Sequence, residues 1–329
     1  MTNRPVVPVF PLLLTKAAQC RRWLLALLLC FLLPACSSLS TNYQYQQLSS
    51  AELSAIELSD TPFFPQQQYH CGPAALATVL QVSGVQAANP DSLAEQVYLP
   101  DRQGSLQAEL LAASRRAERI PYVLAPQLTD LLAELDAGHP VLVLQNLGLA
   151  RWPRWHYAVV IGFDPNKQQL LLRSGSRYRQ SMSLRQFERS WQLADYWAMV
   201  VPAPGQLPAT AEPLRYLQAV AAVEQQQRWL LAAEGYHAAE RRWPEQATSA
   251  FGLGNIAYQQ QDFAAAKAHY YRATELAPAE AAYYFNLSWA LLRLGQAAEA
   301  LKIAAITAQL APDHPRYGKA IQLLEQAME

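Results

Sequence analysis

The chain has 329 residues, and its 26 Lys and Arg balance 26 Asp and Glu, so the formal net charge at pH 7 is zero. Hydrophobic residues make up 51% and charged residues 16% of the sequence, which excludes an intrinsically disordered chain and gives no basic footprint for nucleic acid. At about 100 to 200 residues per domain, the length predicts two folded units. We expect their partners to be peptides or proteins, not nucleic acid.

Residues 1–36 have the pattern of a lipoprotein signal peptide. Arg21 and Arg22 precede the apolar run WLLALLLCFLL. This run is shorter than the ~20 residues of a transmembrane helix and fits the apolar core of a signal peptide, about 7 to 15 residues. The segment ends in LPAC, which resembles a lipobox and implies lipidation of Cys36; an ordinary signal peptide cut near Ala35, or an uncleaved anchor, is the alternative. The Ser after this Cys resembles outer-membrane sorting of bacterial lipoproteins. The expected location is therefore the periplasmic face of the envelope, at the outer rather than the inner membrane.

Cysteine usage singles out one thiol. Cys20 and Cys30 lie in the signal segment and Cys36 would be acylated, so Cys71 alone remains. No disulfide can then form within the mature chain. Because a single thiol in an oxidising compartment is a hazard unless it is buried or used, Cys71 is predicted to be either a core residue or a nucleophile.

Composition then marks a tether and a mixed domain. Residues 37–61 are rich in Ser, Gln and Thr and are predicted to be a tether. Residues 62–204 combine helix-like stretches after Cys71 and over 106–117 and 128–137 with the later strand-like runs VLVLQ, HYAVVIGFD, QQLLLRSG and YWAMVVPA. Helices first and an antiparallel sheet afterwards predict an α+β domain.

A repeat of 34 residues identifies the region after the Pro-rich linker 205–212. Pro244, Pro278 and Pro312 are 34 residues apart, which is the period of the tetratricopeptide repeat (TPR). Small, apolar and aromatic positions keep the same spacing: Ala232, Ala266 and Ala300; Leu253 and Leu287; Gly254 and Ser288; Tyr236 and Tyr270. Each helix pair of such a solenoid hides its apolar face only against its neighbour. Residues 213–329 are therefore predicted to form an all-α TPR solenoid with a capping helix over 315–329; a generic Ala-rich helical bundle is the alternative.

Cys71 is predicted to lie at the N-terminus of a helix. It is followed by Gly72, Pro73 and a run of helix-forming and apolar residues that starts at Ala74. Pro suits the first helical turn because the amide that it lacks would be unpaired there. The partial positive charge of the unpaired amides favours the thiolate, which is the nucleophilic form of Cys71.

A thiol nucleophile needs a base, and six histidines follow the signal segment: His70, His139, His156, His237, His269 and His314. The last three fall in the repeats. His70 adjoins the Cys at the same helix start, and His139 stands in a turn-like Gly-His-Pro. His156 opens the apolar strand HYAVVIGFD and is the predicted base.

CGPAALATVL and, 85 residues after the Cys, HYAVVIGFD resemble segments of the bacteriocin-processing cysteine peptidases that remove double-glycine leaders, and of related stand-alone domains. The resemblance covers residues 62–204 and implies a papain-like cysteine peptidase fold. It implies that Cys71 is the nucleophile, His156 the general base and later acid, and Gln66 the glutamine that stabilises the oxyanion together with the Cys71 amide. Gln67 and Gln68 are alternatives for that glutamine. The loss of one oxyanion donor typically costs about 3 to 4 kcal/mol.

The sequence departs from the family where the base is oriented. The family has an Asp in a short Asp-Pro motif at the end of the strand after the His strand, and Ser174 stands at the matching place here. Asp164 is the nearest carboxylate, but Asp-Pro-Asn has the pattern of a turn. A Ser hydroxyl can fix the tautomer of His156 but stabilises its imidazolium less than a carboxylate does, which predicts slow, specialised or lost activity.

These patterns predict an envelope-anchored cysteine peptidase that hydrolyses a peptide or related amide bond, with TPR repeats that dock the substrate or a protein partner. Two alternatives remain open: a non-enzymatic scaffold with a degenerate peptidase fold, and an acyltransferase of papain-like fold. No metal or cofactor is expected, because no ligand cluster or cofactor fingerprint is found in the sequence. Trp152, Trp155, Tyr157 and Trp197 are predicted to line a substrate groove near His156 or to pack in the core.

Overall fold

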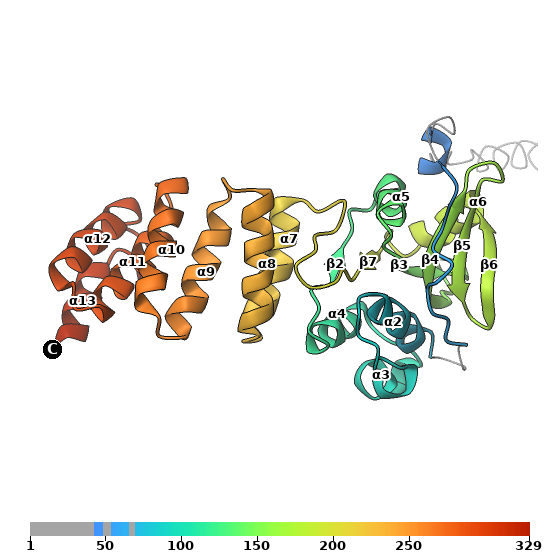
Figure 1. Cartoon of the computed structure of the whole chain (residues 1–329), viewed down its shortest axis with the longest axis horizontal. Helices are drawn as coiled ribbons and strands as arrows, with labels where there is room; N and C mark the ends of the chain where they lie inside the picture. The colour runs from blue at the N-terminus through green and yellow to red at the C-terminus, as the bar shows by residue number, and fades with distance from the viewer. Residues whose placement is uncertain (1–42, 49–53, 66–69) are drawn as a thin grey trace, which may run out of the picture. The chain divides into compact units, whose positions relative to one another are not determined.

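The computed structural model describes residues 43–48, 54–65 and 70–329. The predicted signal peptide, the predicted lipidation site Cys36 and the candidate oxyanion residue Gln66 lie outside these ranges. The described residues form an α+β domain built on one sheet, followed by a series of helices that reaches the C-terminus (Figure 1). Every helix in these three ranges is too short or too polar to span a lipid bilayer.

The sheet of the first domain is antiparallel throughout its pairings. Its strands run in the order β2-β7-β3-β4-β5-β6, and β1 pairs with β4. The strand bounds are β1 (Ile56–Glu57), β2 (Tyr122–Val123), β3 (Val141–Asn146), β4 (Trp155–Asp164), β5 (Gln169–Ser174), β6 (Arg177–Ser183) and β7 (Ala198–Val200). The helices of this domain are α2 (Cys71–Val82), α3 (Pro90–Val97), α4 (Gln107–Arg116), α5 (Leu128–Asp136) and α6 (Leu184–Gln192).

Helices cover both faces of the sheet (Figure 1). Because side chains alternate along a strand, β4 contributes Ala158 and Val160 to one apolar cluster and Tyr157, Val159 and Ile161 to another. The first cluster includes residues of α5 and α6, and the second includes residues of α2, α3 and α4. The second cluster therefore fixes the helix that carries Cys71 against the strand that carries His156.

Within residues 62–204, four α-helices and strands were not predicted from the sequence: α3, β2, β6 and α6. Strand β6 reads RYRQSMS and is mostly exposed, so it lacks the apolar alternation on which a strand prediction rests. The short helix α6 follows directly and begins at the N-cap Ser183, whose side chain accepts a hydrogen bond from the Gln186 amide. The predicted strands VLVLQ, HYAVVIGFD and QQLLLRSG correspond to β3, β4 and β5.

The segment predicted to be a bare tether packs against the domain wherever the structure describes it. The amides of Gln44 and Tyr45 donate to the carboxylate of Glu188 in α6, which is fully buried. Farther along, β1 pairs with β4 at Gly162, where an added Cβ would lie 2.3 Å from the carbonyl oxygen of Ile56. The absence of a side chain at Gly162 therefore lets β1 join the sheet.

The C-terminal helices form TPR-like pairs. Their bounds are α7 (Pro213–Glu224), α8 (Trp229–Arg242), α9 (Ala247–Gln259), α10 (Phe263–Leu276), α11 (Ala281–Arg293), α12 (Ala297–Leu310) and α13 (Ala320–Met328). Pro244, Pro278 and Pro312 each lie two residues beyond the end of a second helix, α8, α10 and α12. An added Cβ on Gly254 would lie 2.5 Å from the ring of Tyr270, which explains the small residue at that position. The capping helix is α13, shorter than the predicted 315–329.

The predicted linker is held by hydrogen bonds. Glu134 in α5 is fully buried, and its carboxylate accepts from the amides of Ala209 and Thr210, from the Thr210 hydroxyl and from the His139 ring. The Tyr122 hydroxyl donates to the carbonyl of Thr210. Apolar residues of β2, α7 and α8 also share one cluster. The linker is thus a packed joint rather than a flexible connection.

Candidate active site

Cys71 is the first residue of α2, as the sequence predicts, although the helix begins three residues before the predicted run at Ala74. His70 is the N-cap residue. Gly72 packs against Ser105: an added Cβ would lie 2.5 Å from the Ser105 Oγ and 2.7 Å from its Cβ. No larger residue fits at position 72 without displacing Ser105, which gives a steric reason for the Cys-Gly pair.

His156 lies near the start of β4, opposite Gln145 of β3. Its Nε2 lies 2.8 Å from the Oγ of Ser174, which ends β5 and is 6% exposed. When the Nε2–H donates to this hydroxyl, Nδ1 is unprotonated and can accept a proton. Ser174 is therefore placed to orient the ring of His156 through Nε2; because a hydroxyl can both accept and donate, the contact fits either tautomer.

Cys71 and His156 line one cavity of about 930 Å³. The backbone amides of Tyr157, the residue after His156, and of Cys71 and Gly72 act to lower the pKa of the Cys71 thiol. The structure thus brings three of the four residues of the predicted site together. The walls of this cavity include Ser105, Trp155 and the Tyr157 side chain.

Burial governs the titration of the pair. Burial raises the pKa of the Cys71 thiol, although the three nearby amides act in the opposite direction. Burial also lowers the pKa of His156 to about 4, and the positive charge of Arg154 adds to this effect. The helix N-terminus favours the thiolate as predicted, but burial outweighs it. Both shifts favour the protonated thiol and the neutral imidazole at neutral pH, so Cys71 would have to lose its proton before it could act as a nucleophile.

The other candidates have structural roles. Asp164 accepts hydrogen bonds from the backbone amide and the ammonium group of Lys167, and it lies about 26 Å along β4 from His156 at ~3.3 Å per residue. It is a turn residue, not the His orienter. The Nδ1 of His139 lies 2.7 Å from the Glu134 carboxylate. His70 packs edge-on against Tyr98, with 5.1 Å between the ring centroids.

The four aromatic residues predicted near His156 divide into three groups. Trp155 and Tyr157 line the cavity. Trp197 packs edge-on against Tyr157, with 5.9 Å between the ring centroids. Trp152 is 68% exposed and is not among the residues that line the cavity.

The lining residues that were not anticipated from the sequence include Arg102, Ser105 and Arg154. No sequence motif marks them, and only the folded chain brings them to the cavity of Cys71. The Ser105 Oγ is buried and has no hydrogen-bond partner among the described residues. Over the same residues, no group of three or more His, Cys, Asp or Glu side chains could hold a metal ion.

Known proteins resemble both parts of the chain. Residues 58–199 match the model of the Peptidase_C39 like family. Among solved structures, a putative C39-like peptidase from Bacillus anthracis is 17% identical, with a TM-score of 0.38, over 45% of this chain and 98% of the other. The type III secretion translocator chaperone SycD of Yersinia enterocolitica is 16% identical, with a TM-score of 0.33, over 36% of this chain and 94% of the other. The TPR2B domain of yeast Sti1, solved as a complex with pHsp70, is 17% identical, with a TM-score of 0.31, over 33% of this chain and 91% of the other. No curated protein matches the chain.

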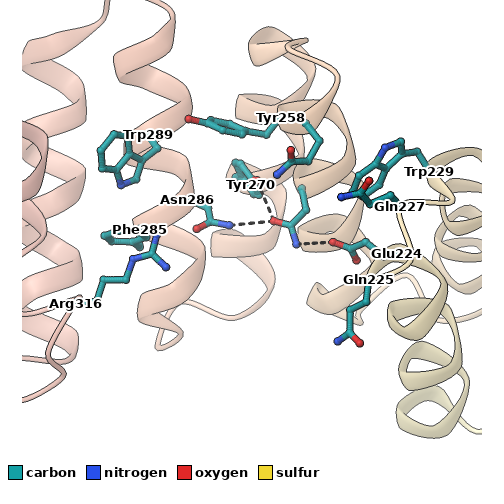
Figure 2. A pocket seen from close by; sticks show the side chains of 12 residues that line it. Glu224, Gln225, Gln227, Trp229, Tyr258, Tyr270, Phe285, Asn286, Trp289 and Arg316 are labelled. Carbon is teal, nitrogen blue, oxygen red and sulfur yellow. Dashed lines mark hydrogen bonds between the residues drawn. The ribbon is translucent and has the colours of Figure 1, made fainter. Parts of the chain in front are cut away.

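The repeats enclose a second cavity, of about 570 Å³ (Figure 2). A chain of side-chain hydrogen bonds crosses it. Asn286 donates to Asn255 over 3.0 Å, and Asn255 donates to Glu224 over 3.1 Å. The Tyr270 hydroxyl also donates to Asn255. The 34-residue period aligns Asn255 with Trp289 rather than with Asn286, so the repeat pattern gave no sign of this pairing.

Proposed function

We propose that the protein is a cysteine peptidase that is lipid-anchored at Cys36 on the periplasmic face of the bacterial envelope, with repeats that dock a peptide or protein. The observation that carries the proposal is the shared cavity of Cys71 and His156 in a C39-like domain. The bond of 2.8 Å between His156 and Ser174 supports it, because it gives the imidazole an orienting partner.

The chemistry follows from the protonation states. The Cys71 sulfur attacks the carbonyl carbon of a peptide bond while its proton passes to His156 Nδ1. The C–N bond breaks, the leaving amine takes this proton, and a thioester remains on Cys71. Water then attacks the thioester and gives its proton to His156. The carboxylic acid departs, and the proton returns to the sulfur.

The amide of Cys71 at the start of α2 is the described donor for the oxyanion of both tetrahedral intermediates. Gln66 is proposed as the second donor, from the resemblance alone.

The Ser174 hydroxyl bears on the expected rate of peptide hydrolysis. When it accepts from Nε2–H it leaves Nδ1 unprotonated, but it carries no negative charge to stabilise the imidazolium. The low pKa of His156, about 4, points in the same direction. We therefore expect slow turnover. The same two observations favour a second candidate function, a non-catalytic domain that binds peptides without cleaving them.

The cavity in the repeats supports a docking role. Its walls combine the aromatic residues Trp229, Tyr258 and Trp289 with the polar chain from Glu224 to Asn286 (Figure 2). The indole N–H of Trp289 is buried and lacks a hydrogen-bond partner among the described residues, so it can donate to a bound carbonyl. An extended peptide segment fits this combination, because it offers backbone acceptors and side chains for aromatic contact.

Cleavage of a complex peptide mixture tests the peptidase proposal. The full chain in detergent is incubated with proteome-derived peptides, and new termini are identified by mass spectrometry. We expect cleavage that is lost in Cys71→Ala and strongly reduced in His156→Ala. If the products of the full chain and of Cys71→Ala are identical, the non-catalytic candidate replaces the peptidase.

Incorporation of a labelled fatty acid into cells that express the chain tests the anchor. We expect label on the protein, and no label on the Cys36→Ala variant. Label on both proteins, or on neither, would refute anchoring at Cys36.

A further inference from the structure

The active-site cavity carries unbalanced positive charge. Arg102 and Arg154 line it, and none of its described lining residues is an Asp or Glu. Neither arginine takes part in an ion pair within the described ranges. Two uncompensated cations beside a nucleophile make this a site for a negatively charged group.

Hydrogen bonds hold the backbone around both arginines in place. Arg102 ends the short 3-10 helix Pro100–Arg102, and the Leu99 amide closes the segment around this helix by donating to the Gly104 carbonyl over 2.8 Å. The Tyr157 hydroxyl of β4 donates to the carbonyl of Ser105 and so ties the end of this segment to the sheet. The segment that carries Arg102 is thus tied to β4, the strand of His156.

The loop of Arg154 is anchored in the same way. The Arg154 amide donates to the side chain of Asn146 over 2.9 Å, and its carbonyl accepts from the Leu147 amide. The two guanidinium groups therefore extend from fixed backbone positions, which reduces the ordering that a ligand would have to impose.

A third group in the cavity points to the same ligand chemistry. The buried Ser105 hydroxyl has no partner among the described residues, and it lies beside Gly72 at the start of α2. A buried hydroxyl without a partner gains a hydrogen bond when a ligand supplies an acceptor. A carboxylate supplies such acceptors and a negative charge for the arginines.

We propose that the cavity selects peptide substrates that carry a carboxylate close to the scissile bond, with Arg102 and Arg154 as the residues that recognise it. This inference rests on the proposed function. It also links substrate binding to catalysis: burial is the main cause of the low pKa of His156, and a carboxylate that offsets the charge of Arg154 reduces the repulsion that adds to it. Acidic substrates thus make His156 a stronger base for the Cys71 thiol than neutral substrates do.

Two small alkylating agents test the charge of the site without a known substrate. Cys71 of the full chain in neutral detergent is alkylated with anionic iodoacetate and with neutral iodoacetamide, and modification is read by mass spectrometry of the Cys71 peptide. The measured quantity is the ratio of the iodoacetate rate to the iodoacetamide rate. We expect a higher ratio in the folded protein than in urea. We expect it to fall by about five-fold in Arg102→Gln and in Arg154→Gln, the effect of about 1 kcal/mol for one exposed charge, while Arg185→Gln in α6 leaves it unchanged.

Peptide protection extends the test to substrates. A blocked peptide with Glu residues should slow alkylation by iodoacetamide more than its Gln counterpart does, and this difference should vanish in the double variant Arg102→Gln with Arg154→Gln.

The outcomes separate the two proposals. If Cys71 reacts and the reaction depends on His156, but neither the rate ratio nor the protection depends on the arginines, the recognition of acidic substrates is refuted and the peptidase stands. If folded Cys71 reacts with neither reagent, both proposals fail.

Discussion

The contact between Gly72 and Ser105 predicts that Gly72→Ala destabilises the native chain but stabilises a chain that carries Ser105→Gly. In the native chain, a Cβ at position 72 would lie 2.5 Å from Ser105 Oγ and 2.7 Å from Ser105 Cβ. The Cβ cannot move without the backbone, so Gly72→Ala forces α2 and the Ser105 loop apart. Overpacking of this kind costs about 1 to 3 kcal/mol in the free energy of unfolding. Because Ala is better than Gly inside a helix by about 0.5 to 1 kcal/mol, the net loss should lie between about 0 and 2.5 kcal/mol.

The substitution Ser105→Gly removes the clash between Ser105 and a Cβ at position 72. With Ser105→Gly in place, the nearest remaining atom to the new Cβ is Cδ2 of Tyr157, at 3.5 Å, which is an ordinary contact. Gly72→Ala should then stabilise the protein by about 0.5 to 1 kcal/mol, the helix preference alone. Urea unfolding of the four proteins, followed by tryptophan fluorescence, gives both differences. The same sign in both backgrounds would refute the steric account of Gly72.

Three further substitutions have expected outcomes. Ser174→Asp places a carboxylate beside His156, so the pKa of the imidazole should rise and Cys71-dependent cleavage should be at least about ten-fold faster; unchanged cleavage would show that the orienting group does not limit the reaction. Glu134→Gln should lower the free energy of unfolding at neutral pH by about 1 to 3 kcal/mol, because buried donors lose a charged acceptor. Burial would raise the pKa of Glu134, but hydrogen bonds from His139 and Thr210 outweigh it and leave that pKa lowered. The stability from the carboxylate is therefore full above its usual pKa and is lost as the pH falls through the lower folded value, so urea unfolding of Glu134→Gln should show a weaker pH dependence in that acid range. Gly162→Ala should release β1, seen as faster amide hydrogen exchange at Ile56 and Glu57; unchanged exchange would contradict the role of Gly162.

The repeats and the start of α2 were predictable because each rests on local chemistry. Proline cannot continue a helix, so three prolines in strict spacing mark three helix ends wherever the chain folds. The Cys71-Gly72-Pro73 sequence likewise marks a helix start. Strands β3, β4 and β5 were visible because they are apolar over most of their length.

The rest depended on contacts between distant residues. The buried carboxylates Glu134 and Glu188 are ordinary acidic residues in the sequence, and only folding turns them into acceptors for the linker and for the segment near Gln44. The titration of Cys71 could not be read from its helix start, because the surrounding burial outweighs the amides. The charge of the cavity was equally hidden, since Arg102 and Arg154 are 52 residues apart in the sequence.

The central claim is that His156 takes the proton of Cys71, and the pH profile of Cys71 alkylation by iodoacetamide tests it most directly. The full chain and His156→Ala are compared from acidic to alkaline pH. Since burial raises the pKa of the thiol and lowers that of His156 to about 4, the imidazole stays neutral and can accept the thiol proton, as a weak base, at mildly acidic pH where the thiol alone does not ionise. The account therefore predicts a slow reaction that is independent of pH over the mildly acidic range in the full chain, and only an alkaline limb in His156→Ala. A single alkaline limb, identical in both proteins, would contradict it.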